Sequence, residues 1–216
     1  MKKHLSLLML LAALIVPWAS NAQEIVTIGD ASSTVTHYTL PVNMYYNYSL
    51  TQQIYTASEI GVAGTITSIA FEYTNSSSFS MSGVQVYMKN VSKTEFTSTS
   101  DMEPISASDL VWTGTLSATG PGWVNIQLDA PFVYDGTSNL LVCFYDPTNG
   151  YPGSAYVYRS TATTSYLGIS YYSDSYTPSL TDVTSFSGSK TRYQYRANIQ
   201  IEMTVGDISC YPVYHS

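Results

Sequence analysis

Hydrophobic and polar residues alternate with a period of two through most of this sequence, which is the pattern of β-strands that bury one face. In the segment RANIQIEMTV, for example, Ile199, Ile201 and Met203 alternate with Gln200 and Glu202. The same pattern, broken by turn residues, predicts about nine to eleven short strands. We place them at residues 24–29, 31–42, 45–55, 65–73, 84–91, 110–117, 122–129, 140–145, 154–160, 166–173 and 196–205.

Three segments depart from this alternation. The run from Leu140 to Tyr145 is apolar on both sides, which predicts a central strand covered on both faces. Residues 92–110 contain two helix-capping patterns, SKTE and SASD, but no long amphipathic run follows either, so we expect single turns in a long connection. Residues 174–195 are predicted to form a long polar loop. The whole pattern predicts an all-β fold, a two-sheet antiparallel β-sandwich that is jelly-roll-like.

One strand is unusually rich in tyrosine, the segment YYNYSLTQQIY at residues 45–55. With a period of two, Tyr46, Tyr48, Leu50 and Ile54 share one face of this strand. A tyrosine ring can bury apolar area while its hydroxyl reaches the rim. We therefore interpret the segment as a wall of the core and not as an exposed aromatic platform.

The N-terminus is typical of a secretory signal peptide. Lys2 and Lys3 precede an apolar run from Leu5 to Val16, and small residues end the segment at Ala22. We expect cleavage before Gln23, one β-sandwich domain at residues 23–206, and a C-terminal tail at 207–216. This predicts a secreted or cell-surface protein, with the periplasm as the alternative location. No later stretch is long enough to be a transmembrane helix, so we expect no transmembrane segment after cleavage.

Charge argues against nucleic acid as a partner. The chain has 8 Lys and Arg residues against 15 Asp and Glu, and two of the basic residues, Lys2 and Lys3, lie in the predicted signal peptide. No basic stripe is available to neutralise phosphates.

The sequence contains no catalytic or cofactor motif, so we expect no enzymatic activity and no cofactor. No His-x-x-x-His, Cys-x-x-Cys or Gly-x-Ser-x-Gly spacing occurs, which argues against a zinc site or a serine nucleophile. Oxygen-bearing side chains gather near residues 129–149, but we interpret them as turn caps and predict no metal site. They are Asp129, Asp135, Asn139, Asp146 and Asn149. Cys143 and Cys210 could form a disulfide in an exported protein, and the alternative is a buried thiol at Cys143.

Aromatic residues outside the expected core are the candidates for ligand binding, because sugars stack on exposed aromatic faces. Trp123 follows GPG and shares a face with Asn125 and Gln127, so we expect it to be exposed. The full candidate set is Trp123, Trp112, Tyr151 and Tyr172. The alternative is that these residues belong to the core and rim of the sandwich.

Several segments occur in the order found in a domain of exported surface proteins from Bacteroides-like bacteria, and the chain resembles that domain over nearly all of residues 24–205. The resemblance implies a jelly-roll-like β-sandwich, distantly similar to the cleaved-adhesin domains of gingipain-type proteases. It implies no catalytic residues. The matching segments are EIVTIG, QQIY, GTITSIAF, VYMK, SDLV and YDGTSNLLV.

Three functions agree with these observations. The first is a non-catalytic binding or adhesion module that recognises carbohydrate or a host or cell-surface protein. The second is a structural spacer with no ligand of its own, and the third is an accessory domain of a surface hydrolase. Fold class does not decide between them.

Overall fold

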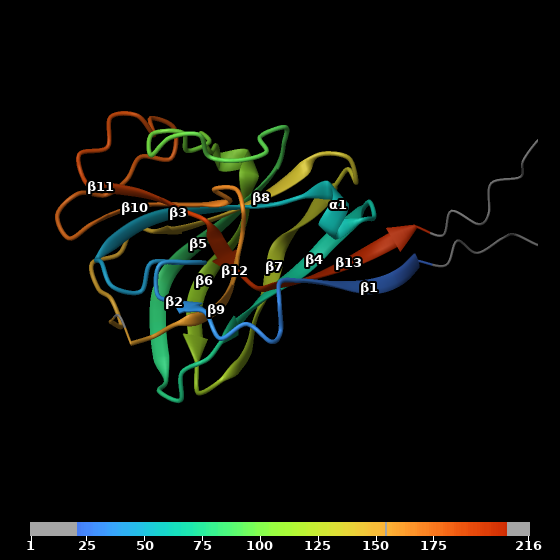
Figure 1. Ribbon diagram of the computed structural model, residues 1–216, viewed down its shortest axis with the longest axis horizontal. Coiled ribbons are helices and arrows are strands. Elements are labelled where there is room, and N and C mark those ends of the chain that lie inside the picture. The colour runs from blue at the N-terminus through green and yellow to red at the C-terminus, as the bar shows by residue number, and fades with distance from the viewer. Residues whose placement is uncertain (1–20, 154, 207–216) are drawn as a thin grey trace, which may run out of the picture.

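The computed structural model describes residues 21–153 and 155–206, which form two antiparallel β-sheets packed face to face (Figure 1). This confirms the predicted all-β sandwich. The predicted tail at residues 207–216 lies outside the described residues. So does the predicted signal peptide, except for Asn21 and Ala22, which begin the first strand. Among the residues described, no helix has the length and apolar character needed to cross a bilayer.

The first sheet has seven strands in the order β1-β13-β4-β9-β12, with β7 also paired to β4 and β2 paired to β9. These strands are β1 (Asn21–Ile28), β2 (Thr36–His37), β4 (Gly64–Tyr73), β7 (Gly122–Tyr134), β9 (Tyr158–Ala162), β12 (Tyr195–Ala197) and β13 (Ile199–Gly206).

The second sheet has six strands in the order β11-β10-β3-β8-β5-β6. These strands are β3 (Tyr48–Tyr55), β5 (Phe79–Val91), β6 (Leu110–Ala118), β8 (Asn139–Asp146), β10 (Gly168–Ser173) and β11 (Ser189–Tyr193). The short helix α1 (Ala57–Ile60) and a 3-10 turn (Ala107–Asp109) both begin with a capping box, as the sequence predicts for the 3-10 turn.

Eight of these strands have the strand order of a jelly roll. The runs β1-β13-β4-β7 and β3-β8-β5-β6 correspond to strands 1-8-3-6 and 2-7-4-5 of two interleaved Greek keys. The remaining strands are additions. β2 lies between the first and second jelly-roll strands in the chain, and β9 to β12 lie between the seventh and eighth.

The main core lies between the sheets, and a second apolar cluster covers the outer face of the six-stranded sheet. Side chains of β8 point alternately into the main core and into the second cluster. Phe144 packs in the main core, and Leu141 and Cys143 pack in the second cluster. The second cluster is closed by the connections 92–109 and 174–188, which contribute side chains such as Phe96 and Phe186. The prediction of a strand covered on both faces at residues 140–145 is confirmed.

The prediction for the tyrosine-rich strand was wrong in three respects. β3 begins at Tyr48, so Tyr46 lies before the strand, and both tyrosines are partly exposed. Leu50 and Ile54 are fully buried as predicted, but in the second cluster and not in the main core. The face expected to be polar and open is buried as well. Thr51 and Gln53 on this face are hydrogen-bonded to distant backbone; the Ala197 amide, for example, donates to Gln53 Oε1 at 2.7 Å.

The predicted polar loop at residues 174–195 was wrong at its C-terminal end, where β11 and the start of β12 form. Both strands are short, β11 is mostly half-buried and β12 has only three residues, so their hydrophobic alternation is weak. β11 extends one sheet and β12 the other, because the chain crosses between the sheets at Gln194.

Candidate functional site

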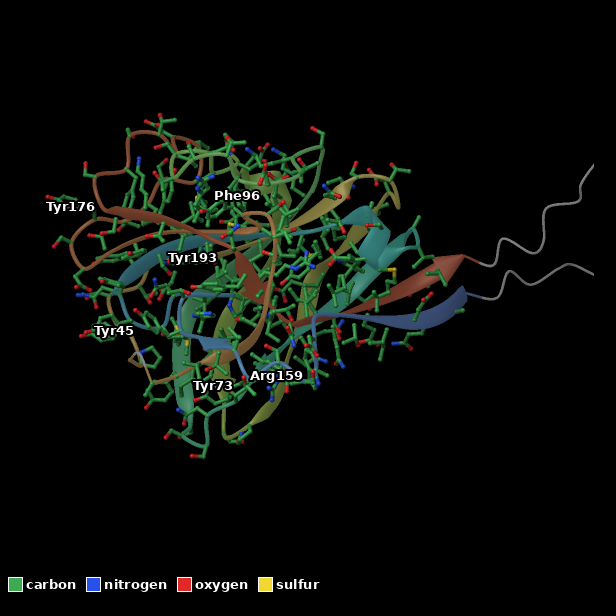
Figure 2. All side chains as sticks on the ribbon, in the orientation of Figure 1. Tyr45, Tyr73, Phe96, Arg159, Tyr176 and Tyr193 are labelled. Atoms are coloured by element: carbon green, nitrogen blue, oxygen red, sulfur yellow. The ribbon has the colours of Figure 1, made fainter. Side chains whose placement is uncertain are left out.

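A tyrosine-lined hollow lies at one end of the sandwich, where the added strands of the two sheets meet. It encloses about 260 Å³. In Figure 2, Tyr193 lies toward the same end of the molecule as Tyr45 and Tyr176, opposite the free ends of β1 and β13. We call this site the tyrosine hollow. Its lining residues are His37, Tyr38, Thr39, Asn43, Tyr46, Tyr172, Thr191, Tyr193 and Tyr195.

All of these residues come from the two additions to the jelly roll. Residues 37–46 belong to the connection between β1 and β3, and residues 172–195 to the segment between β8 and β13. The eight jelly-roll strands contribute none of the lining, so the hollow is a feature built onto the fold rather than a consequence of it.

One wall is a stack of rings on β2, β11 and β12. The His37 and Tyr195 rings are stacked, with centroids 3.5 Å apart and planes 7° from parallel. The Tyr193 ring lies against Tyr195 with a centroid distance of 4.8 Å, because the two residues flank the crossing at Gln194. The hydroxyls of Tyr195 and Thr39 are hydrogen-bonded at 2.8 Å, which fixes the outer end of the stack.

The other wall is formed by Tyr46, in the connection before β3, and Tyr172, on the neighbouring strand β10. The rings of Tyr46 and Tyr172 lie 4.4 Å apart, tilted by 40°. The Tyr172 hydroxyl is 3.2 Å from the Thr191 hydroxyl on the neighbouring strand β11. Both tyrosines are partly exposed, so ring surface remains available to a ligand.

Asn43 supplies a polar group at the hollow that lacks a partner. Its side chain is fully buried, and its Oδ1 accepts a hydrogen bond from the Tyr45 amide at 3.1 Å. Its Nδ2, in contrast, has no hydrogen-bond partner among the described residues. A buried donor left unpaired costs about 1–3 kcal/mol, so such groups in folded proteins call for an explanation.

The hollow is uncharged at neutral pH. Its lining holds no carboxylate, ammonium or guanidinium group among the described residues. Burial lowers the pKa of His37 below its ordinary value of 6.5, so the imidazole is neutral. Burial also raises the pKa of Tyr195 to about 12 and raises that of Tyr193, so both phenols keep their protons and can donate hydrogen bonds.

The four sequence candidates fall in different places. Tyr172 lines the tyrosine hollow, and Tyr151, half exposed, packs its ring against Tyr45 beside it. Trp123 is 39% exposed, as expected, but it lines a separate hollow at the β6–β7 turn. Trp112 packs partly against the main core. The structure therefore brings Tyr172 and Tyr151 into one region and leaves both tryptophans outside it.

Sequence reasoning missed most of the hollow. Tyr193 and Tyr195 fell in the segment predicted as a loop, and Tyr46 was assigned to the core. Asn43 lay between two predicted strands, at 31–42 and 45–55, and was not singled out. One signal was available: the sequence YQY places the two tyrosines at alternate positions, as a strand would. Nothing local indicates that the Asn43 amide lacks a partner.

The acidic turns and the cysteine behave as structural groups. Asp135 Oδ1 accepts hydrogen bonds from the amides of Thr137 and Ser138 at 2.8 and 2.7 Å, which confirms the turn-cap interpretation there. Cys143 is buried, and burial raises the pKa of its thiol, so the thiolate nucleophile is disfavoured. Cys210 lies outside the described residues, and the Cys143–Cys210 disulfide stays a prediction.

No protein-family model matches the sequence, and no curated protein is significantly similar to it. The resemblance to a surface-protein domain of Bacteroides-like bacteria therefore stays a prediction. Evidence on function therefore comes from the structure of the tyrosine hollow.

Proposed function

We propose that this protein is an exported, non-catalytic binding domain that recognises neutral carbohydrate in the tyrosine hollow. The observation that carries the proposal is the buried Asn43 Nδ2 donor, unpaired among the described residues, in a lining of uncharged aromatic rings. Nδ2 is itself buried, so a ligand reaches it through a small shift of the neighbouring side chains, and its acceptor then satisfies the donor.

The chemistry of the lining matches the two kinds of surface on a sugar. A pyranose ring has an apolar face of C–H groups that packs on aromatic rings such as Tyr46 and Tyr172. Its hydroxyls accept and donate hydrogen bonds, which suits Asn43 and the tyrosine hydroxyls. The volume of about 260 Å³ is below the roughly 300–1,000 Å³ of pockets that hold drug-sized ligands, so a small unit such as one sugar ring is appropriate.

The absence of charge in the described lining supports a neutral ligand over an acidic one. Phosphate and carboxylate groups are bound by Arg, Lys or helix N-termini, and the lining offers none of these. Asp174 lies close by, where its Oδ1 accepts from the Asn47 amide at 3.2 Å. The pKa of Tyr46 is raised mainly by burial, and the charge of Asp174 contributes to the rise. An acidic sugar would meet that negative charge without a compensating cation.

The spacer alternative explains the jelly roll but not the hollow. Unpaired buried polar atoms also occur away from the hollow, as at Gln53 Nε2, so the Asn43 donor supports binding only together with the partly exposed rings that line the hollow beside it. We therefore favour binding over a purely structural role.

The test is a calorimetric titration of the protein with a panel of neutral and acidic sugars. We expect binding to neutral sugars, weakened at least about tenfold by Tyr172→Ala, which corresponds to about 1.4 kcal/mol. The matched control is Trp123→Ala, which also removes a partly exposed aromatic side chain but from the separate hollow. Loss of binding in Trp123→Ala with retention in Tyr172→Ala would contradict the proposal, as would binding of acidic sugars alone.

A further inference from the structure

We propose that the tyrosine hollow is one end of a longer binding track, and that the ligand is a chain of several neutral sugar units. The track consists of Tyr172 and Tyr46 in the hollow, followed by Tyr45 and Tyr151 outside it; we call it the tyrosine track. This inference rests on the proposed function and specifies its ligand.

The four rings of the tyrosine track contact one another in series. Tyr172 and Tyr46 have centroids 4.4 Å apart, Tyr46 and Tyr45 5.3 Å, and Tyr45 and Tyr151 5.7 Å. The last two are exposed by 42% and 50%, respectively, which is unusual for large aromatic side chains. A row of rings that runs from a hollow onto the surface can hold successive units of a chain, because each ring offers a face for stacking.

Backbone hydrogen bonds hold the track in place. The amide of Gly153 donates to the Met44 carbonyl at 2.8 Å, which ties the Tyr151 loop to the Tyr45 loop. The Asn43 side chain holds the Tyr45 amide on the other side, so one residue both lines the hollow and positions the first exposed ring. Rings held in advance lose little freedom on binding, which favours affinity.

The angles between the rings specify the shape of the ligand. The planes of Tyr45 and Tyr46 are 89° apart, and those of Tyr45 and Tyr151 are 58° apart. A flat array of coplanar rings would suit the face of a crystalline polysaccharide, and these tilts do not provide one. The track instead fits a single, bent chain whose sugar rings turn from one unit to the next.

Charge along the track selects for neutral units, as it does in the hollow. Asp174 lies beside Asn47, next to the track, and the chain as a whole has a net charge of −7. A chain of uronic or sialic acids would be repelled, whereas a neutral chain would be unaffected.

The experiment is a titration of the full chain with neutral glucose-, mannose- and xylose-based oligosaccharides, from single sugars to hexasaccharides. We expect the affinity for one of these series to rise at least tenfold from the single sugar to the longer chains. Tyr45→Ala and Tyr151→Ala should remove most of that gain and weaken the binding of the single sugar far less than they weaken the binding of long chains. The matched control is Tyr176→Ala, because Tyr176 is 56% exposed but forms no ring pair with the track among the described aromatic pairs.

The outcomes separate this inference from the proposed function. If a single sugar binds, Tyr172→Ala abolishes the binding and chain length has no effect, the track is overturned and the hollow stands. If Tyr176→Ala reduces the affinity for long chains as much as Tyr45→Ala, the track is also overturned. If no neutral sugar of any length binds, the proposed function fails together with the track.

Discussion

Two polar side chains, the buried Asn43 and the partly buried His37, give the tyrosine hollow its chemistry. Asn43 contributes the unpaired donor, and His37 contributes a neutral ring stacked on Tyr195. Both are polar residues in the connection between β1 and β3. Burial decides their behaviour, since it leaves the amide of Asn43 unpaired and lowers the pKa of His37.

His37 predicts a pH dependence of stability. Its pKa is lowered on folding, so below the unfolded value of 6.5 the unfolded chain binds more protons than the folded protein. Stability contributed by the neutral ring is therefore lost as pH falls from 7 through 6.5 towards the lowered pKa. We expect the melting temperature to fall more between about pH 7 and pH 5 in the natural protein than in His37→Phe, which keeps a planar ring.

Differential scanning calorimetry of the two proteins in parallel measures this difference. Carboxylates with lowered pKa values, such as Asp101, lose their contribution at lower pH, and the raised pKa of Asp146 has the opposite sign. Both proteins share these groups, so the difference between them isolates His37. Equal losses of melting temperature in the two proteins would show that His37 is not buried in its neutral form.

At the scale of elements, the sequence predicted the parts of the fold that bury a regular apolar face. Most strands of the jelly roll alternate clearly because one side of each faces the core, and β8 lacks alternation because both its sides are buried. β3 is also buried on both sides, but its residues alternate because one buried side is polar. The sequence could not predict where polar side chains are buried by distant partners. Gln52, for example, lies inside because it bonds the backbone of Glu103 in both directions, at 2.6 and 2.8 Å.

The hollow was harder to predict than the sandwich for the same reason. β11 and β12 are short additions of five and three residues, so they carry little hydrophobic pattern. Their tyrosines acquire a role only when β2 and the connection before β3 are placed against them. Their position in or near loops made Tyr151 and Tyr172 candidates from the sequence. Their contacts with Tyr45 and Tyr46 join residues that are far apart in the chain, so the sequence pattern could not predict them.

Because residues 92–109 contribute side chains to the second apolar cluster, we expect this connection to be as important for stability as a core strand. Phe96 is fully buried in this connection and packs over the outer face of the six-stranded sheet. We expect Phe96→Ala to lower the free energy of unfolding by about 3–5 kcal/mol, as for a core phenylalanine. The neighbouring Thr94 is exposed, and Thr94→Ala should change stability by less than about 0.5 kcal/mol.

Urea unfolding of both variants measures these free energies. A loss of less than about 1 kcal/mol in Phe96→Ala would mean that the connection can move aside without exposing the sheet. The second cluster would then be a cover and not part of the folded core.

At the scale of the whole molecule, the tyrosine track and the ends of the described chain lie at opposite ends of the sandwich. Asn21 and Gly206 pair in register, and β1 and β13 extend away from the added strands (Figure 1). A surface or neighbouring domain attached beyond either strand would leave the hollow facing outward. This arrangement suits a module that presents a binding site, which agrees with the proposed function.

The most direct test of carbohydrate binding in the hollow is a nitrogen–proton NMR titration of the labelled protein with neutral oligosaccharides. One spectrum reports the side-chain amide of Asn43 and the indole N–H of Trp123, so it compares the two candidate sites without mutation. We predict that the Asn43 amide shifts and saturates with ligand concentration, because its unpaired donor gains an acceptor, while the Trp123 indole stays in place. A shift of the Trp123 indole with a stationary Asn43 amide, or no shift of either at millimolar sugar, would contradict the account.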